Sequence, residues 1–143
     1  MIVSQILKAK GNDVFTVSKD VKISEVSEIL ASKRIGAIVV TDQNQVVEGI
    51  ISERDIVRGL AKLGANVLDS SADELMTKNV ITRGVDAHID ELMQEMTNSR
   101  IRHLPIIDDN KLVGVISIGD VVKNRVEELE SEGSMLREYI ATG

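Results

Sequence analysis

The chain of 143 residues contains the same pattern twice, and this repeat restricts its fold more than any other feature. With a shift of 66 positions, Val14-Phe15-Thr16 aligns with Val80-Ile81-Thr82. One residue then drops out in a polar turn, and with a shift of 65 Gly49-Ile50-Ile51-Ser52 aligns with Gly114-Val115-Ile116-Ser117. A hairpin loop tolerates such a gap. The repeat predicts two copies of one folding unit, followed by a tail.

Each copy has the pattern strand, helix, strand, strand, helix. In the first copy we expect these elements at residues 14–17, 24–32, 37–40, 46–51 and 53–62, and in the second at 80–82, 90–98, 104–107, 112–116 and from 118 onward. Ser24 is the expected N-cap of the first helix, and short helical turns are expected at 4–8 and 72–76, with linker at 64–66 and 69–71. One such unit buries little core alone, so we predict an α/β (α+β) fold in which the two pack as a pseudo-two-fold pair.

We place the first unit at residues 1–65, the second at 66–125 and a helical tail at 126–143. The tail region carries an apolar stripe at helical spacing, interrupted near Gly133: Val122, Val126, Leu129, Leu136 and Ile140. Two interpretations stay open for this helix, which either lies on its own domain or contacts a second copy. We expect a homodimer, because its surface helices carry the apolar residues Ile56, Val57, Leu60, Val121 and Val122.

The composition excludes several classes of protein. A net charge of −6 argues against a broad nucleic-acid surface. The only aromatic residues are Phe15 and Tyr139, so a ring-shaped ligand is expected to lie between aliphatic side chains. The absence of cysteine excludes disulfides, thiolate catalysis and cysteine-based metal sites, and it is consistent with a cytoplasmic protein. The sequence has neither a long apolar run nor a signal-peptide layout.

A heptapeptide at the second-strand-to-helix junction of each copy carries the most specific signal. It reads Gly-Ile-Ile-Ser-Glu-Arg-Asp at 49–55 and Gly-Val-Ile-Ser-Ile-Gly-Asp at 114–120. With Arg-Ile-Arg-His-Leu-Pro at 100–105, these segments resemble a tandem pair of cystathionine-β-synthase (CBS) domains over nearly the whole chain. The resemblance implies adenosine-nucleotide binding in the cleft between the domains, a disc-shaped homodimer and a regulatory role.

The heptapeptide also has a physical interpretation. A helix start offers free N–H groups and a positive dipole end to a phosphate, and Ser52 and Ser117 add a hydroxyl there. The carboxylates of Asp55 and Asp120 can accept from both hydroxyls of a ribose, while the leading glycine lets a ligand approach the chain. The same S-x-x-D spacing is also typical of a capping box, and that alternative stays open.

The resemblance assigns further residues to the two clefts. Thr16 and Thr82, with walls from Val14 and Val80, are expected to line the adenine slot; as an alternative, threonine is simply a good strand residue. We expect Arg102 and His103 beside Ser117 and Asp120, and Arg54 to reach a phosphate beside Ser52 and Asp55. These arginines could instead form surface ion pairs, and His103 could simply pack. The remaining candidates are Ala37, Arg100, Leu104 and Pro105. Because proline lacks an N–H, Pro105 is expected at a sheet edge or at the start of a strand.

Three function classes remain open at this point. The first is a sensor that binds AMP, ADP, ATP or NAD(H), without a required metal, and acts through dimer geometry or an unknown protein partner. The second is a ligand-free interaction module with the same fold. The third is a regulatory piece of an enzyme such as IMP dehydrogenase, although the initiator Met1 and the tail favour a stand-alone protein. The sequence contains no P-loop, G-x-S-x-G or H-E-x-x-H motif, so we do not expect an enzyme.

Overall fold

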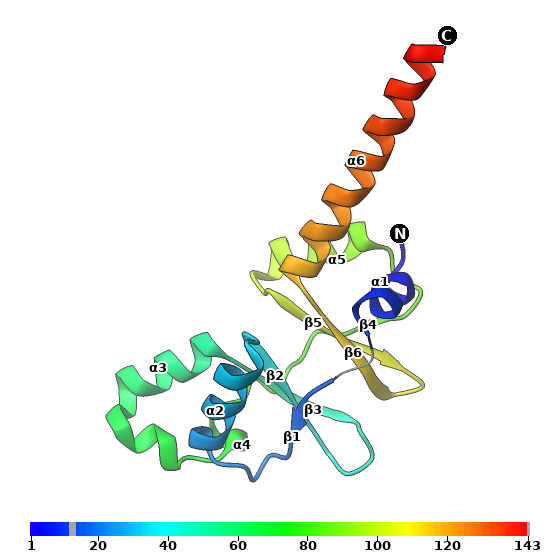
Figure 1. Ribbon diagram of the computed structural model, residues 1–143. Helices are drawn as coiled ribbons and strands as arrows, with labels where there is room; N and C mark the ends of the chain where they lie inside the picture. Colours follow the sequence, from blue (N-terminus) through cyan, green and yellow to red (C-terminus); the bar gives the residue numbers. More distant parts are fainter. Residues whose placement is uncertain (12–13, 143) are drawn as a thin grey trace.

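Each predicted unit forms a three-stranded sheet with two helices in the computed structural model, which describes residues 1–11 and 14–142 (Figure 1). The first unit contains β1 (Thr16–Val17), α2 (Ile23–Lys33), β2 (Ala37–Thr41), β3 (Val47–Ser52) and α3 (Glu53–Leu63). The second contains β4 (Arg83–Gly84), α5 (Ile89–Ser99), β5 (His103–Asp108), β6 (Lys111–Ser117) and α6 (Ile118–Thr142). A leading helix precedes each unit, α1 (Val3–Lys10) and α4 (Ala72–Leu75), and a 3-10 helix, η1 (Gly64–Asp69), occupies part of the predicted linker.

The two sheets share one topology, β1-β2-β3 and β4-β5-β6. In each sheet the central strand is antiparallel to the strand that follows it and parallel to the short first strand. The predicted repeat of strand, helix, strand, strand, helix is therefore confirmed. The last two strands form a hairpin whose end leads directly into α3 or α6, which places both heptapeptides at a strand-to-helix junction.

Some predicted boundaries were wrong. In the second unit, the first strand is Arg83–Gly84 and does not include Val80–Thr82. Its pairing is still the one that the repeat predicts, because Arg83 pairs with Ile106 as Val17 pairs with Val40. Ser24 is not the N-cap of α2: the helix begins at Ile23 and follows Lys22, whose side chain makes no capping hydrogen bond. Ile23 is fully buried, so burial of this apolar side chain fixes the helix start one residue before the serine.

Pro105 lies inside the central strand β5, not at an end of it, and pairs with Val115 on β6. The short β4 covers only Ile106 and Ile107, so the part of β5 that holds Pro105 has no neighbour on that side within the described strands. A proline at this position therefore removes no ladder bond to β4. The expected edge-like environment exists, but in the middle of a strand and not at its start.

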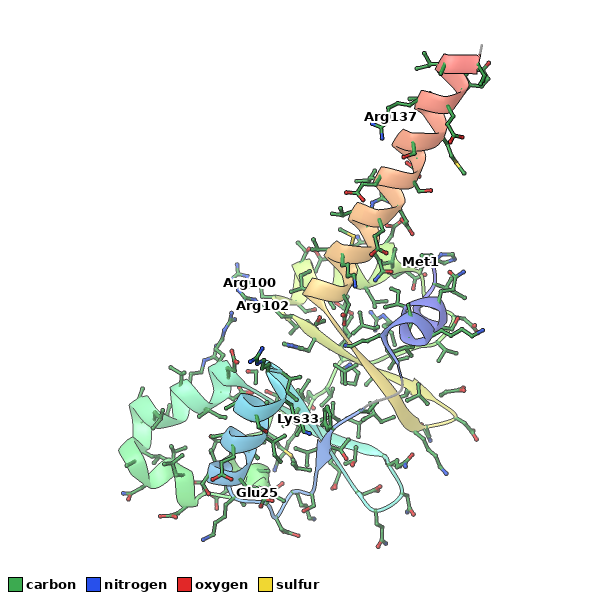
Figure 2. The ribbon with its side chains drawn as sticks, in the orientation of Figure 1. Met1, Glu25, Lys33, Arg100, Arg102 and Arg137 are labelled. Atoms are coloured by element: carbon green, nitrogen blue, oxygen red, sulfur yellow. The ribbon has the colours of Figure 1, made fainter. Side chains whose placement is uncertain are left out.

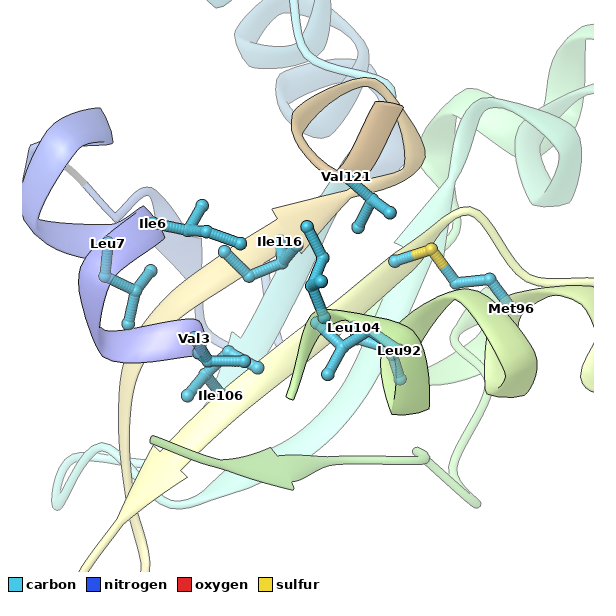
Figure 3. Packing of buried hydrophobic residues seen from close by; sticks show 10 residues of the cluster. Val3, Ile6, Leu7, Leu92, Met96, Leu104, Ile106, Ile116 and Val121 are labelled. Atoms are coloured by element: carbon cyan, nitrogen blue, oxygen red, sulfur yellow. The ribbon is translucent and has the colours of Figure 1, made fainter. Parts of the chain in front are cut away.

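The two hydrophobic cores exchange their leading helices. Figure 3 shows that α1 packs its residues Val3, Ile6 and Leu7 against the core of the second unit. Ala72 of α4 belongs to the core of the first unit. Backbone bonds fix both exchanges, from Val3 N–H to the carbonyl of Ala87 (2.9 Å) and from Ala72 N–H to that of Val21 (2.7 Å). Each core is therefore completed by a segment that the chain supplies from outside the repeat, and the cores do not follow a chain boundary between residues 65 and 66.

The motif glycines serve this exchange. A Cβ at Gly114 would lie 2.4 Å from Cδ2 of Leu7, and a Cβ at Gly49 would lie 2.4 Å from Sδ of Met76. Both distances are far below a normal carbon contact. Each glycine therefore admits the side chain of a packed segment, Leu7 of α1 or Met76 after α4, and the expected approach of a ligand to these glycines stays a prediction.

Helix α6 leaves the body of the molecule as one continuous helix (Figure 1). The predicted interruption near Gly133 is absent from the described helix, which runs to Thr142. Two of the five residues expected on an exposed apolar surface, Ile56 and Val121, are instead buried in the cores, whereas Val57, Leu60 and Val122 are exposed. Among the described residues, no helix combines the length and the hydropathy that crossing a membrane requires.

We predict that Gly114→Ala lowers the free energy of unfolding by about 1–3 kcal/mol, because the added methyl group forces Leu7 and α1 away from β6. Chemical denaturation measures the change. Gly49→Ala should cost at least as much, since the added methyl group would lie 2.4 Å from Sδ, 2.7 Å from Cγ and 3.0 Å from Cβ of Met76, and a Cβ atom moves only with the backbone. In a double-mutant cycle, Leu7→Ala should relieve part of the Gly114→Ala loss. Additive losses in that cycle would show that Leu7 is not the obstructing group.

Candidate functional site

A cleft of about 430 Å³ lies between the two units. Its walls come from α1, from the segments before β1 and β2, and from β5 and β6. Its lining includes Lys10, Phe15, Arg34, Ala37, His103 and Ser117. The cleft is therefore a joint product of both repeats and of the exchanged helix α1.

The first turn of α6 opens beside this cleft. Ser117 Oγ accepts a hydrogen bond from the Asp120 N–H (3.1 Å), and the Ser117 N–H donates to Asp120 Oδ2 (2.9 Å). These two reciprocal bonds are a capping box, so the capping interpretation of the motif is correct in the structure. Capping uses Oδ2, and no described residue donates a hydrogen bond to Asp120 Oδ1. That oxygen remains available to a ligand.

Lys10 connects α1 to the same carboxylate. Its Nζ lies 2.7 Å from Asp120 Oδ2 and donates to the carbonyl of Val115 at 2.8 Å. Burial acts to raise the pKa of Asp120, but the hydrogen bonds from Lys10 and Ser117 outweigh it and hold that pKa below its ordinary value. Asp120 is therefore a fixed negative charge, and Lys10 is a partly exposed cation next to it.

His103 occupies the contact between the units. A Cβ at Gly36 of the first unit would lie 3.2 Å from its Cε1 atom. Burial lowers the pKa of His103, and the positive charges of Lys10 and Arg102 lower it further against the opposing effects of Asp120 and Glu53. The imidazole is therefore neutral at pH 7, and it can offer one donor and one acceptor to a ligand.

The equivalent turn of α3 has no lysine. Ser52 and Asp55 form the same capping box, with Ser52 N–H to Asp55 Oδ2 at 2.8 Å and Asp55 N–H to Ser52 Oγ at 3.2 Å. The Ser52 hydroxyl also donates to Asp55 Oδ2 (3.1 Å). Met76 lies over Gly49 as Leu7 lies over Gly114, but among the described residues no lysine or arginine pairs with Asp55 as Lys10 pairs with Asp120. The two motifs thus differ in their electrostatics, although their caps are alike.

Three arginines gather in a second cleft of about 270 Å³. Arg54 comes from the first turn of α3, Arg100 ends α5 in a left-handed conformation, and Arg102 follows it. Figure 2 shows Arg100 and Arg102 beside each other where the two units meet. This group of exposed cations is suited to an anion such as a phosphate.

The structure brings only some of the predicted site residues together. Val14, Ala37, His103 and Ser117 line the first cleft, with Asp120 held to it by Lys10, while Arg54, Arg100 and Arg102 line the second. Arg102 was expected beside Asp120 but lines the other cleft. The remaining candidates line neither cleft: Thr16, Ser52, Asp55, Val80, Thr82, Leu104 and Pro105. Leu104 and Pro105 are buried inside β5, where their side chains contribute to packing.

Several residues that line the first cleft were missed in the sequence, and Phe15, Arg34 and Lys10 are the ones with an aromatic ring or a charge. Phe15 lines the cleft, so a ring-shaped ligand would not lie between aliphatic side chains alone. The Nζ atom of Lys33 lies 4.8 Å from the centre of that ring. Arg34 could have been found, since it aligns with Arg100 of the noted loop. Lys10 had no such signal, because its role depends on the exchange of α1. Within the described ranges, no three His, Asp or Glu side chains are grouped as a metal site requires.

Comparison with known proteins gives a consistent result. The sequence model of the CBS domain matches residues 3–62 and 72–127. A crystal structure of a CBS-domain protein from Agrobacterium tumefaciens is 46% identical, with a TM-score of 0.84, over 87% of this chain and 99% of that chain. A CBS domain-containing protein of Bacillus subtilis is 30% identical over 93% of both chains. A CBS domain pair solved with 5′-methylthioadenosine and S-adenosyl-L-methionine is 26% identical, with a TM-score of 0.80, over 90% of this chain and 98% of that chain.

We predict that the protein loses stability as the pH falls below about 6.5, before its carboxylates titrate. The folded state lowers the pKa of His103 from 6.5, so below that pH the unfolded chain takes up a proton that the folded chain does not. Urea denaturation between pH 7.5 and 5.5 measures this slope. His103→Asn should flatten it, and an unchanged slope in that variant would remove His103 as the cause.

Proposed function

The chain belongs to the CBS domain family, and on that premise we propose that it is a regulatory module that binds an adenosine nucleotide in the cleft between its two units. The observation that carries this proposal is the first turn of α6, where Ser117 and Asp120 border a cleft that also contains Lys10, Arg34 and His103. A cleft of about 430 Å³ has the volume typical of a small-molecule site. The candidate ligands are AMP, ADP, ATP and NAD(H).

Each part of a nucleotide has a suitable partner in this cleft. Asp120 Oδ1 can accept from a ribose hydroxyl while Oδ2 keeps its bonds to Ser117 and Lys10. The Phe15 ring and the Val14 and Ala37 side chains offer apolar surface to a base. Lys10 and the exposed Arg34 provide the positive charge that an anion needs on a protein of net charge −6.

The ligands of one related CBS pair support the choice of an adenosine-containing ligand. The related pair was solved with two adenosine derivatives that carry no phosphate. The cations at both clefts of this chain favour an anionic member of the same ligand class. The second cleft, with Arg54, Arg100 and Arg102, is where we place the phosphates of a second nucleotide or the distal part of a longer one.

A ligand-free interaction module is the second candidate, and one observation favours it. The Ser-Asp motifs are already satisfied by capping, and Lys10 already neutralises Asp120. A thermal-shift screen with AMP, ADP, ATP, NAD, NADH, S-adenosylmethionine and GTP separates the two candidates. A ligand that binds the folded state raises the midpoint by mass action. No shift with any of these compounds, and no nucleotide released from the denatured protein, would favour the interaction module.

We further propose that ligand binding acts on a homodimer or on a protein partner, because exposed apolar side chains cover part of α3. Val57, Leu60 and Leu63 of α3 are between 43% and 63% exposed. Such side chains are typical of a surface that is covered in the assembled state. These three side chains line neither cleft and take no part in the Ser-Asp capping boxes, so ligand binding and assembly can be tested separately.

We predict that Asp120→Ala lowers the affinity for an adenosine nucleotide by roughly 10- to 150-fold, which is the effect of losing one hydrogen bond to a charged group. Calorimetric titration with AMP and with NAD measures the change. The 2′-deoxy form of AMP should bind poorly even to the unmutated protein, since it lacks one ribose hydroxyl.

Asp55→Ala is the matched control, because it removes the same capping carboxylate from the other copy. Both variants should lose about 1 kcal/mol of stability as capping is lost. If Asp120→Ala shows that loss but keeps its affinity, Asp120 is only a helix cap. If both variants keep their affinity, the ribose role is wrong at both motifs.

We predict that Arg54→Ala and Arg102→Ala lower the affinity for ATP more than the affinity for adenosine, because the arginines contact the phosphates and not the base. The ratio of the two affinities in each variant is the measurement. Arg58→Ala is a suitable control, since Arg58 is an exposed arginine of the same helix as Arg54 but does not line either cleft. Equal weakening of ATP and adenosine would contradict a phosphate role.

A further inference from the structure

The apolar residues of α6 recur at alternating intervals of four and three. They are Val122, Val126, Leu129, Leu136 and Ile140, with Gly133 at the remaining position of the pattern. This is a heptad repeat in which Val126, Gly133 and Ile140 occupy position a and Val122, Leu129 and Leu136 occupy position d. The five apolar side chains are between 46% and 68% exposed, so nothing in the described chain covers the stripe.

The face of α6 that contacts its own domain is the opposite one. Val121 is fully buried in the second core, Asn124 is buried, and Glu128 forms an ion pair with the amino group of Met1 (3.4 Å). These residues occupy heptad positions c, f and c, which lie away from the a and d positions. The apolar stripe therefore points away from the body, and the C-terminal part of α6 projects beyond it (Figure 1).

The charges on either side of the apolar stripe indicate which partner helix and which orientation fit it. Between Val122 and Ile140, position g carries Arg125, Glu132 and Tyr139, and position e carries Lys123, Glu130 and Arg137. In a parallel pair of identical helices, position g of one helix faces the next position e of the other. Arg125 then faces Glu130, and Glu132 faces Arg137, so both pairs have opposite charges. An antiparallel pair that aligns the same six layers brings Glu130 against Glu130 and Glu132 against Glu132.

From this pattern we propose that the α6 helices of two copies form a parallel, in-register, two-stranded coiled coil over residues 122–140. Shape and charge both fit this occupant: the seam is apolar, it faces away from the body, and its flanks attract only in the parallel arrangement. A solitary helix is marginally stable in water, and pairing gives the projecting part of α6 the tertiary packing that it lacks. The proposal does not depend on the nucleotide site, since none of these residues lines either cleft.

Cross-linking tests both the partner and the orientation, because the chain has no cysteine of its own. In a parallel, in-register coil, Leu136→Cys brings two thiols to the same layer, and oxidation should give a covalent dimer in high yield. Met135→Cys is the control: Met135 is also exposed, at 68%, but it occupies position c. Equal yields from the two variants would overturn the proposed seam.

A mixture of Leu136→Cys and Val126→Cys detects the antiparallel alternative. In that arrangement the mixed dimer forms and the Leu136→Cys dimer does not, a result that overturns the parallel coil. The proposal is overturned altogether if the protein does not cross-link and sediments as a monomer at every concentration from the micromolar range to about 100-fold above it. If the Leu136→Cys dimer forms and the mixed dimer does not, the proposal is confirmed.

Gly133 offers a second test, in which a substitution is expected to strengthen the dimer. A glycine at position a leaves a hole in each chain, and a Cβ at Gly133 meets nothing within 4 Å in the single copy. Gly133→Leu should therefore fill the seam and lower the dimer dissociation constant at least tenfold, measured by sedimentation equilibrium. Leu129→Glu should raise that constant at least tenfold, whereas Ser131→Glu, at position f, should not. Circular dichroism verifies that each variant is folded. An unchanged dissociation constant in Gly133→Leu and Leu129→Glu would place the dimer contact elsewhere.

Discussion

The packing of α1 against β6 is the contact on which the rest of the structure depends. Leu7 approaches Gly114 so closely that only a glycine fits beneath it, and Val3 and Ile6 complete the second core (Figure 3). The same placement brings Lys10 to Asp120 and makes α1 a wall of the inter-unit cleft. One apolar contact thus completes a core, fixes a charge pair and shapes a binding site, because all three lie on one short helix.

The same contact makes the two halves of a repeat protein unequal. Both heptapeptides form the same capping box, and both glycines admit a side chain from a packed segment outside their own sheet. Only the second receives a cation, since Lys10 pairs with Asp120 whereas no lysine or arginine of the described residues pairs with Asp55. An ion pair of this kind keeps Asp120 charged and places positive charge where an anion would bind. A duplicated scaffold can in this way carry one polarised cleft and one arginine-lined cleft without any change of fold.

Helix α6 illustrates how the same segment serves two surfaces. Its first turns bury Val121 in the second core, and the opposite face displays an apolar seam. Because α6 begins directly after the motif strand β6, its first turn is also the capped turn that borders the cleft. A rigid helix therefore joins the cleft to the seam, and a displacement of its first turn would be carried along the helix axis to the proposed contact with a second copy.

The sequence alone determined the repeat, its order of elements and the capping of both motif helices. These features are local: apolar period, turn residues and S-x-x-D spacing act within a few residues of each other, so alignment of the two copies could predict them. It could not predict that Gly114 serves Leu7, that Lys10 meets Asp120, or that Arg102 and His103, adjacent in sequence, line different clefts. Only the tertiary structure decided these, because each depends on which sheet α1 covers and on how the two units pack. That choice is made by burial of apolar surface between segments far apart in the chain, and such burial leaves no local pattern in the residues that it brings together.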